Sequence, residues 1–567
     1  MRTLKKALSL VLVLAMVFTL AVPALAVDKA ADFKDYDKVT NKEAVDVLTA
    51  IGVINGNADG TFGADAKFTR AQGATMIAYL TLGKTVADAL PTSATKFSDV
   101  PANFWGAKYI QYCANEGIIN GYGNGKFGPD DELTSAQWAL MLLGALGYSS
   151  KNEGIGGTGW EIAATRLAMK AGVASADDMV GTMTRDTAAK MAFNTLKADL
   201  VEYQSNGTNI TVGDTNINVG ATKAEAVETK NDNNNIKADG VIQFAEEHFQ
   251  KLKVASEITR DSYGRPAHGW EYKNEKVGTY ADSALFTYTG SFNGNVVNDL
   301  QKQKYTFANT GITYNGGTDA NIDDLSDLYV NDTTGVNGYT VELYATDAEN
   351  PKKITDVIVS EGYFAEVGKF TAAKGKNPAK VVLTVYEHGY TDGADVYDMI
   401  AKYATGDFVV AFCKPGWDSS ASKGETVIFD IQSTTAVAGK ISKVTTGKYI
   451  CTSSVVIDGT TYALNNECVN VKGKVNAGDE GTLYLDAQGN VIGYKGTSTA
   501  VTDKAIAVKD CYTTLENGKL VTKVEGILSS GETTTLVVDK TYDEYAVYTY
   551  ADADKDDVYT LLVTNSI

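Results

Sequence analysis

The chain has 567 residues, of which 21% are charged, and it carries a net charge of −19 at pH 7. At roughly 150 residues per domain, a chain of this length is expected to form three to five domains. The acidic balance argues against nucleic acid as a partner, because phosphates are bound by basic surfaces. It suits a protein that stays soluble among like-charged neighbours, or one that binds divalent cations.

The first residues have the pattern of an export signal. A basic start at Met1–Lys6 is followed by an apolar run, Ala7–Val22, and by the small-residue site Ala24–Ala26. This order is typical of a secretory signal peptide, which we predict at residues 1–26. The alternative, a retained membrane anchor, is disfavoured because the apolar run is short for a bilayer span. We therefore expect a secreted chain without a membrane span in its mature part.

Metal-binding and redox motifs are missing from the sequence. The five cysteines and three histidines show no metal-ligand spacing, although Cys451 and Cys468 are candidates to pair within one module. No cofactor and no resident metal are expected, and calcium is the one ion that the composition suggests. Asp552–Asp557 resembles the opening of a calcium loop, but it lacks the glycine and glutamate that such a loop needs. A solvated acidic turn is the expected role of this segment.

A segment near the N-terminus occurs twice. Gly52–Gln72 aligns with Gly117–Gln137 without a gap, at an offset of 65, with 11 identities in 21 positions. Internal repetition of this kind predicts a repeat architecture.

Each copy predicts a helix, a loop and a second helix. The first helices, Asn41–Ile51 and Ala107–Glu116, end at Gly52 and Gly117, which suits the left-handed residue after a helix. After a turn-rich loop, a Thr-x-x-Gln capping box opens the second helix of each copy. In the first copy this helix is expected to bury Ala74, Ile77 and Leu80 on one face and to end at Gly83.

A third, more divergent copy follows. Trp160 precedes Gly172 by twelve residues, as Trp105 precedes Gly117, and Thr184–Asp186 opens its second helix. Because no unit of helix, loop and helix can bury its apolar face alone, the three units predict one composite domain.

Together these motifs resemble the S-layer homology (SLH) family over roughly residues 31–203. The family pattern is F-x-D-V, a tryptophan, G-I-I-x-G, a D-G-x-F-x-P loop and T-R-A-E. The matching segments are Phe33–Asp35, Phe97–Val100, Trp105, Gly117–Gly121, Asn124–Pro129 and Thr69–Gln72. The resemblance implies three repeats with pseudo-threefold symmetry around a central helical bundle. It also implies binding, in grooves between repeats, to secondary cell-wall polymers linked to peptidoglycan, which often bear pyruvate ketals.

Arginine at helix starts is the chemical argument for an anionic ligand. Arg70 and Arg185 directly follow the threonine that opens a second helix. A cation there opposes the helix macrodipole, so a role other than helix stability is expected to retain it. The planar guanidinium matches the carboxylate of a pyruvate ketal, and the free amides of the helix start would add to anion binding. The alternative is that both arginines pair with neighbouring acids.

Further binding candidates come from the same motifs, and each has a structural alternative. Trp105 and Trp160 either offer a flat face to a sugar ring or fill the core at a helix start. Asp35 and Asp99 either bond to sugar hydroxyls or cap turns. Five glycines either let the backbone approach a ligand or serve conformation alone: Gly52, Gly56, Gly117, Gly121 and Gly172.

The copies also depart from the family pattern. Ser135 occupies the arginine position of the second repeat, the first repeat lacks the tryptophan, and the third lacks the loop and the F-x-D motif. Gln72 replaces the usual glutamate, which keeps the capping geometry but removes a charge. We expect one or two working grooves rather than three.

The remaining two-thirds of the chain changes in character. Residues 204–240 have the composition of a linker, and Val241–Ala255 is predicted to be helical. Beyond it, short Val-, Tyr-, Thr- and Ile-rich runs between glycine turns predict sandwiches or barrels, with one short helix at Asp395–Ala404. The expected strands include Tyr339–Tyr344, Val381–Tyr386, Phe408–Phe412, Thr426–Ile431, Thr482–Leu485 and Val491–Tyr494, with hairpins at Val456–Tyr462 and Leu485–Val491.

The predicted class is a multidomain chain, with a mainly-α SLH triple-repeat domain followed by all-β modules of sandwich or barrel type. The expected ranges are a signal peptide at 1–26, repeats at 31–85, 97–150 and 158–203, a linker at 204–240, a mixed or β module at 241–335, and β modules at 336–435 and 436–567. We expect a wall-anchored surface-layer or structural protein, located at the cell wall or cell surface, that self-associates. The alternatives are a wall-tethered adhesin and an anchored carbohydrate-active enzyme, although no catalytic motif is present.

Overall fold

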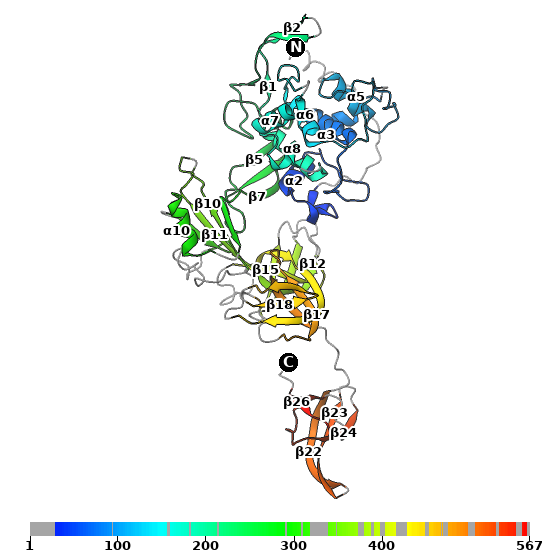
Figure 1. Ribbon diagram of the computed structural model, residues 1–567, viewed down its shortest axis with the longest axis vertical. Coiled ribbons are helices and arrows are strands. Elements are labelled where there is room, and N and C mark those ends of the chain that lie inside the picture. The colour runs from blue at the N-terminus through cyan, green and yellow to red at the C-terminus, as the bar shows by residue number, and fades with distance from the viewer. Residues whose placement is uncertain are drawn as a thin grey trace. The chain divides into compact units, whose positions relative to one another are not determined.

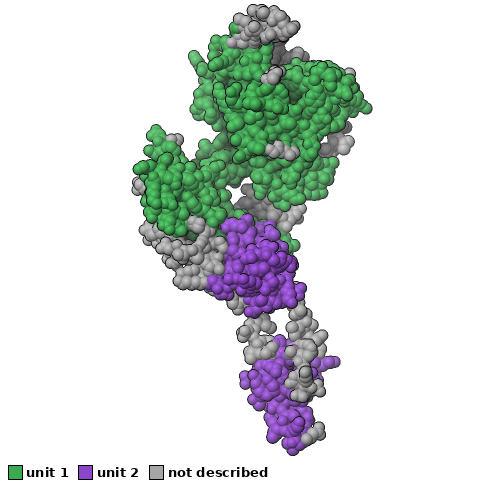
Figure 2. Space-filling model, in the orientation of Figure 1, with its two compact units in different colours: residues 1–432 green, residues 433–567 purple. Residues whose placement is uncertain are grey.

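The computed structural model describes residues 29–92, 95–155, 159–180, 183–212, 215–289, 292–307, 310–317, 338–347, 349–371, 379–386, 390–396, 403–414, 428–447, 453–465, 468, 475–496, 505–516, 518–528, 532–550 and 558–563. The chain divides into two compact units, residues 1–432 and 433–567 (Figure 2). The predicted signal peptide and Asp552–Asp557 lie outside the described residues.

Three helix pairs form the N-terminal body of the first unit (Figure 1). The second helix of each repeat packs on the first helix of another repeat: α3 on α5, α6 on α7, and α8 back on α2. This order closes a cycle, as the resemblance to SLH repeats implied. The helices are α2 (Lys42–Ala50), α3 (Arg70–Leu82) and the short α4 (Lys84–Asp88) in repeat 1, α5 (Ala107–Asn115) and α6 (Ser135–Leu146) in repeat 2, and α7 (Trp160–Lys170) and α8 (Arg185–Lys197) in repeat 3. Single 3-10 turns lie at Ala30–Asp32, Tyr36–Lys38 and Asp177–Met179.

Local capping chemistry sets these helix bounds. Thr69 and Thr134 each accept a hydrogen bond from the backbone of the glutamine three residues on, and that glutamine bonds back, so both predicted capping boxes are confirmed. Gly52, Gly117 and Gly172 follow the ends of the first helices with φ of 79°, 73° and 72°. Only glycine adopts this left-handed conformation without steric cost.

One hydrophobic core fills the centre of the repeat cycle. Ala74, Ile77 and Leu80 of α3 are fully buried in it, as their spacing predicted. Trp138 of α6 is also fully buried, and its Nε1 donates to the carbonyl of Ala188 in α8 at 3.1 Å. The central helices are therefore joined by apolar packing and by a satisfied buried polar group.

The core of the repeats continues beyond residue 203. Phe244, Leu252 and Trp270 are buried in the same cluster, and the Trp270 ring meets Phe193 of α8 edge-on at 5.4 Å. These residues belong to α9 (Phe244–His248) and to a three-stranded sheet of β5 (Leu252–Ala255), β6 (Ala267–Tyr272) and β7 (Glu275–Ala281). The helix predicted over Val241–Ala255 is confirmed only at Phe244–His248 and is wrong beyond it, because the chain leaves the helix at Phe249 and Leu252–Ala255 form a strand.

The segment expected to be a linker contains paired strands. β1 (Val201–Glu202) pairs with β4 (Glu225–Ala226), and β2 (Asn206–Val212) forms a hairpin with β3 (Thr215–Ala221). The backbone of Leu200 also bonds to Ile242, at 2.9 Å. Residues 204–240 therefore form an excursion whose two ends are hydrogen-bonded to each other at the N-terminal body, rather than a linker to a separate domain.

A polar cluster joins the three-stranded sheet to repeat 1. Glu43 of α2 accepts hydrogen bonds from Trp270 Nε1 at 2.7 Å and from the His268 ring at 2.8 Å. Asp46 accepts from the hydroxyls of Tyr36 and Tyr280 at 2.8 and 2.7 Å. Burial raises the pKa of Asp46 to about 6, and the bond with Glu43 raises the pKa of His268.

Two further sheets complete the first unit. The first, in the order β8-β10-β11-β9, buries α10 residues in its core, and the second has the order β14-β13-β12-β15-β16. Their elements are β8 (Phe286–Thr289), α10 (Gly294–Lys302), β9 (Gly311–Tyr314), β10 (Tyr339–Tyr344), β11 (Asp356–Glu361), β12 (Tyr363–Thr371), β13 (Ala379–Val385), β14 (Tyr390–Val396), β15 (Phe408–Cys413) and β16 (Ile428–Ser433). The short helix expected from Asp395 is corrected at its start, because Asp395 lies in β14; residues 397–402 lie outside the described residues.

The second unit contains two five-stranded sheets, in the orders β19-β18-β17-β20-β21 and β24-β23-β22-β25-β26. Their strands are β17 (Thr435–Thr445), β18 (Ser454–Ile457), β19 (Thr460–Ala463), β20 (Glu480–Leu485), β21 (Val491–Gly496), β22 (Ala505–Glu516), β23 (Lys519–Leu528), β24 (Thr533–Val538), β25 (Val547–Tyr550) and β26 (Leu561–Val563). An N-terminal helical body followed by all-β modules is the predicted fold class, which is confirmed.

Turn residues place the predicted hairpins correctly. Asp458 and Gly459 have φ of 50° and 78° between β18 and β19, as a tight hairpin requires. Cys468 lies in the core of this module, whereas Cys451 lies outside the described residues, so their pairing stays a prediction.

Candidate functional site

Arg70 connects repeat 1 to repeat 2. From the first turn of α3, its Nε donates to the carbonyl of Phe127 at 2.8 Å and its Nη2 to the carbonyl of Asn120 at 3.1 Å. The guanidinium lies 4.4 Å from the centre of the Phe127 ring and 4.7 Å from that of Tyr122. Arg70 is only 7% exposed. One edge of its fork therefore binds backbone, and its Nη1 has no hydrogen bond within the described part of the chain.

Arg185 makes the equivalent connection from repeat 3 to repeat 1. Its Nε donates to the carbonyl of Phe62 at 2.9 Å, and the guanidinium lies 5.3 Å from the centre of that ring. Phe62 and Phe127 are the equivalent loop phenylalanines of the first two copies. Neither Nη group of Arg185 forms a hydrogen bond with the described residues.

Neither arginine forms an ion pair with an acid among the described residues. The alternative, in which both arginines pair with neighbouring acids, is not seen as a direct ion pair, although Asp131 and Asp99 act on Arg70 and Asp35 acts on Arg185 at longer range. Burial lowers the pKa of both guanidinium groups, although Tyr122 and Asp131 oppose the shift at Arg70 and Asp35 opposes it at Arg185. Arginine stays charged under these conditions, so each site holds a partly desolvated cation that nearby acids stabilise only at a distance, without an ion pair among the described residues.

The backbone amides at these helix starts are already bonded. The amides of Arg70 and Ala71 donate to the carbonyls of Asp131 and Pro129, each at 2.9 Å. At the start of α8, the amide of Arg185 donates to the carbonyl of Ala66 at 2.9 Å. The amide of Asp186 donates to the carbonyl of Ala64, also in repeat 1, at 3.1 Å. The expectation that free helix-start amides would bind an anion is therefore wrong, because the neighbouring repeat caps them.

Asp35 and Asp99 hold the loops of their own repeats. Both oxygens of Asp35 accept backbone bonds, from Phe62 at 2.6 Å and Gly63 at 2.8 Å. Asp99 accepts from Phe127 and Gly128, both at 2.8 Å. These bonds lower the pKa of Asp99 even though its desolvation acts the other way. The hydrogen bonds of both carboxylates thus match the alternative in which Asp35 and Asp99 cap turns rather than bind sugar hydroxyls.

The two tryptophans differ in exposure. Trp105, just before α5, is 55% exposed, and an added Cβ on its neighbour Gly106 would lie 3.6 Å from Cβ of Ala71. Trp105 therefore lies at the start of α5, and its neighbour Gly106 faces Ala71, the residue after Arg70. Trp160 is partly buried and packs against the repeat core, so it follows the core alternative.

Tyr122 is a residue of this site that sequence reasoning missed. It is 49% exposed, stacks on Arg70, and donates its hydroxyl to Asp131 at 2.9 Å. The position equivalent to it in the first copy is Asn57, so comparison of the repeats gave no signal for an aromatic residue here. We call Arg70, Trp105, Tyr122 and Phe127 the 1–2 junction.

The five predicted glycines have conformational or packing roles. An added Cβ at Gly56 would lie 2.4 Å from the Phe33 ring, and one at Gly121 would lie 2.5 Å from the carbonyl of Lys126. Gly117 and Gly172 have open space around them and are required only for their positive φ, while Gly52 has both a positive φ and Lys84 beside it.

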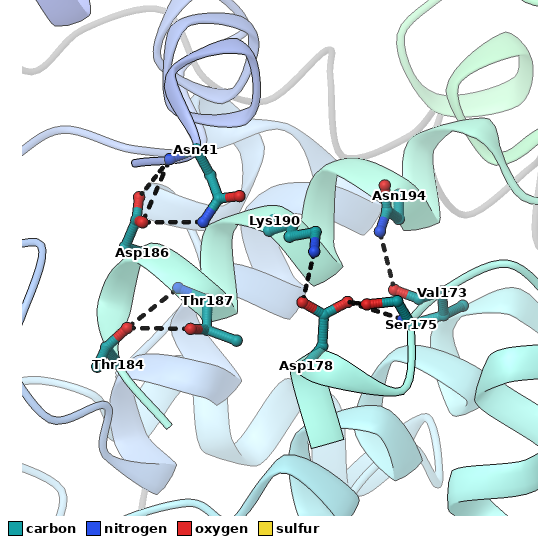
Figure 3. A network of polar contacts seen from close by, with 9 residues as sticks. All are labelled: Asn41, Val173, Ser175, Asp178, Thr184, Asp186, Thr187, Lys190 and Asn194. Carbon is teal, nitrogen blue, oxygen red and sulfur yellow. Dashed lines mark hydrogen bonds and ion pairs between the residues drawn. The ribbon is translucent and has the colours of Figure 1, made fainter. Parts of the chain in front are cut away.

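Repeat 3 replaces the missing loop with side-chain bonds (Figure 3). Buried Asp178 accepts from the backbone and hydroxyl of Ser175, both at 2.7 Å, and pairs with Lys190 at 2.7 Å. Asn41 of repeat 1 donates its side chain to Asp186 at 2.8 Å, which fastens repeat 1 to α8. At the junction of repeats 2 and 3, the arginine position holds the buried Ser135, so that junction has no cation from a helix start.

Comparisons with known proteins agree with this architecture. The S-layer homology domain family matches residues 32–74 and 96–138, which lie in repeats 1 and 2. A "Cell surface protein" of Thermoanaerobacter kivui is 31% identical over 228 residues, 40% of this chain and 28% of the relative. The "Middle cell wall protein" of Brevibacillus brevis is 28% identical over 208 residues, which cover 36% of this chain and 19% of the relative. The "Surface layer protein" of Brevibacillus choshinensis is 28% identical over 209 residues, which cover 37% and 18%.

The chain thus spans less than a third of the length of each of these relatives. Among solved structures, drosophila Unr CSD456 aligns with 36% of this chain at 8% identity and a TM-score of 0.13, which is too low to indicate a shared fold.

The family match identifies repeats 1 and 2 as S-layer homology domains. The protein is accordingly an SLH domain-containing bacterial protein, secreted and located at the cell surface. None of the helices in the described ranges has the length and apolar character needed to cross a bilayer. The described residues also contain no group of three metal-ligating side chains; whether calcium binds stays a prediction.

Proposed function

We propose that the N-terminal body attaches this protein non-covalently to an anionic secondary polymer of the cell wall, and that the 1–2 junction is the principal binding site. The β-sheet modules are then displayed at the cell surface as a structural or surface-layer protein, without catalysis. The observation that carries the proposal is the coincidence, at one junction, of an arginine that forms no ion pair with a described acid and two exposed aromatic residues, Trp105 and Tyr122.

The arginine supports an anionic ligand. Removing a cation from water costs free energy that a nearby anion normally offsets. Arg70 instead lies between backbone carbonyls and aromatic faces, which compensate only in part. Asp131 and Asp99 act on it only at a distance, so a carboxylate placed against Nη1 would add the direct charge-assisted hydrogen bond that the described residues do not provide.

The aromatic rings support a sugar as the carrier of that anion. Tyr122 is exposed and stacks on Arg70, Trp105 is exposed at the start of α5 next to Gly106, which faces Ala71, and flat aromatic faces pack on the apolar face of a sugar ring. A pyruvate ketal combines a rigid ring with a carboxylate, so a polymer that carries such ketals has both required features.

The other two junctions each lack one component. The junction of repeats 3 and 1 has Arg185 but Thr40 at the tryptophan position, and Asn41 there bonds to Asp186. The junction of repeats 2 and 3 has Trp160 but Ser135 instead of arginine. We expect Arg185 to contribute a second, weaker site.

Co-sedimentation of the chain from residue 27 onward with wall sacculi tests the proposal. Arg70→Lys keeps the charge but loses the planar fork, and we expect it to weaken binding by about tenfold, or roughly 1.4 kcal/mol. Trp105→Ala is expected to weaken binding similarly. Arg166→Lys, the same replacement at an exposed position of α7, is the matched control and should sediment like the parent.

Removal of the ligand chemistry completes the test. Sacculi stripped of secondary polymer should no longer retain the chain, and polymer freed of its ketals by mild acid should bind more weakly. The proposal fails if Arg70→Lys and Trp105→Ala sediment as the parent does, or if stripped sacculi retain the chain fully.

A further inference from the structure

In the C-terminal sheet, β22 and β23 run past their neighbours. β25 pairs with β22 only over Ala505–Ala507, and β24 pairs with β23 only over Thr522–Ile527. Among the described residues, Tyr512–Glu516 pair only with β23, and Lys519–Val521 pair only with β22. Figure 1 shows this end of the hairpin extending beyond β24 and β26. We call residues 511–516 and 519–524 the ribbon.

The inner face of the ribbon is an uncovered continuation of the module's core. Val524 is buried in that core and lies opposite Cys511. Side chains on one face of a strand recur every second residue, and directly paired residues share a face. The next pairs on this face are therefore Thr513 with Thr522 and Leu515 with Leu520.

The two leucines at the end of this face are highly exposed. Leu515 is 68% and Leu520 is 74% exposed. An apolar pair at the tip of a two-stranded ribbon gains nothing from the fold of its own module, and a ribbon without further strands is only marginally stable in water. Open strand edges and exposed apolar side chains are features that proteins normally avoid unless a partner covers them.

The charge of the ribbon indicates which partner can cover it. The hairpin of residues 505–528 carries three lysines and three acidic residues and thus has no net charge, in a chain of net charge −19. On the outer face, Lys523 pairs with Glu516 at 2.5 Å. The inner face carries no charged residue, so it offers nothing to an anionic glycan, and it is a place where two copies of this acidic chain can approach without repulsion.

The face is also chemically self-matching. Leucine stands opposite leucine and threonine opposite threonine, so a second ribbon laid on it meets the same side chains from either strand. Homo-oligomers usually use such self-complementary surfaces around a two-fold axis. We infer that the inner face of the ribbon is a contact between two copies of this chain, made by Leu515 and Leu520. This inference does not depend on the wall-binding proposal.

Sedimentation velocity of the chain from residue 27 onward, over a range of concentrations, tests the inference. We expect concentration-dependent association in the parent. Leu515→Ser with Leu520→Ser should weaken it by about tenfold or more, because the core of an interface dominates its affinity. Ile162→Ser, at another exposed apolar position, is the matched control and should associate like the parent.

A charge variant and a crosslink make the test independent of apolar solubility. Lys519→Glu makes the ribbon net negative and is expected to weaken association, more strongly at low salt. Leu515→Cys with a short bismaleimide should give a dimer that the parent, with its native cysteines, does not give. A parent that stays monomeric, or leucine variants that associate as the parent does, would overturn the inference, and wall binding would be unaffected by either result.

Discussion

The shared core predicts that the SLH repeats do not fold stably without residues 206–284. A fragment of residues 27–205 loses four large buried partners of the repeat core, Phe244, Phe249, Leu252 and Trp270, and the smaller Ala245. At about 1.5–3 kcal/mol for each large apolar side chain buried, the loss is roughly 6–12 kcal/mol. A domain is usually stable by about 5–15 kcal/mol, so the fragment should be largely unfolded or close to it.

The polar cluster adds to this loss. Without the three-stranded sheet, Glu43 loses the bonds from His268 and Trp270, and Asp46 loses the bond from Tyr280. An unpaired polar group that stays partly buried costs about 1–3 kcal/mol. The effect acts in the same direction as the lost apolar contacts.

Urea unfolding followed by far-UV circular dichroism measures the effect. With a slope of about 2–3 kcal/mol/M, a loss of about 6 kcal/mol lowers the midpoint by roughly 2–3 M. Residues 27–284 should unfold cooperatively, and Trp270→Ala in that fragment should lose about 3–5 kcal/mol. If residues 27–205 unfold at the same midpoint as residues 27–284, the shared core contributes no stability and the reasoning is refuted.

Three further predictions concern single interactions, each measured by urea unfolding. Asp99→Ala removes two charge-assisted bonds to the second loop and should cost about 2–4 kcal/mol, whereas an unchanged midpoint would mean that the loop holds itself. Thr134→Ala removes an N-cap and should cost about 1 kcal/mol, with Thr134→Ser retaining most of it; equal losses in the two variants would argue against the cap. The pKa values of His268 and Asp46 are raised in the folded chain. Their contributions to the free energy of unfolding are therefore full in acid and are lost as the pH rises; for Asp46 the loss is complete above a pH of about 6. Burial opposes a lower pKa for Glu43, but the hydrogen bonds from His268 and Trp270 and the nearby positive charges together outweigh it, and the pKa of Glu43 is lowered. The stability that Glu43 contributes is therefore lost in strong acid, when its carboxylate is protonated. Stability should therefore peak in mildly acidic buffer and fall towards pH 8, and His268→Gln should flatten that fall; a variant with the parent's pH profile would contradict this assignment.

The sequence predicted the elements whose causes are local. Capping boxes, helix-ending glycines and the Asp458–Gly459 turn act within a few residues, so the helix and strand bounds that they set agree with the structure. The helix α10 could also have been found, because Asn293 caps it and Val297 and Leu300 have helical spacing. The helix expected over Val241–Ala255 is present only at Phe244–His248, because burial in the repeat core, not local propensity, decides the path of the residues that follow.

The candidate site was predictable in its members but not in their contacts. The repeat pattern singled out Arg70 and Trp105, yet the carbonyl that Arg70 binds belongs to Phe127, 57 residues away. The same long-range packing bonded the helix-start amides that had been expected to bind an anion. Tyr122 could not be recognised, because its role comes only from its position over Arg70 in the folded chain.

The most direct test of the account is a hydrogen-exchange footprint of the full chain from residue 27 with and without purified wall polymer. We predict that the polymer slows exchange in residues 103–108 and 118–128, with a weaker effect near Phe62 and none in the β-sheet modules. Protection confined to the modules, or centred on the third repeat away from Arg70, would contradict the account.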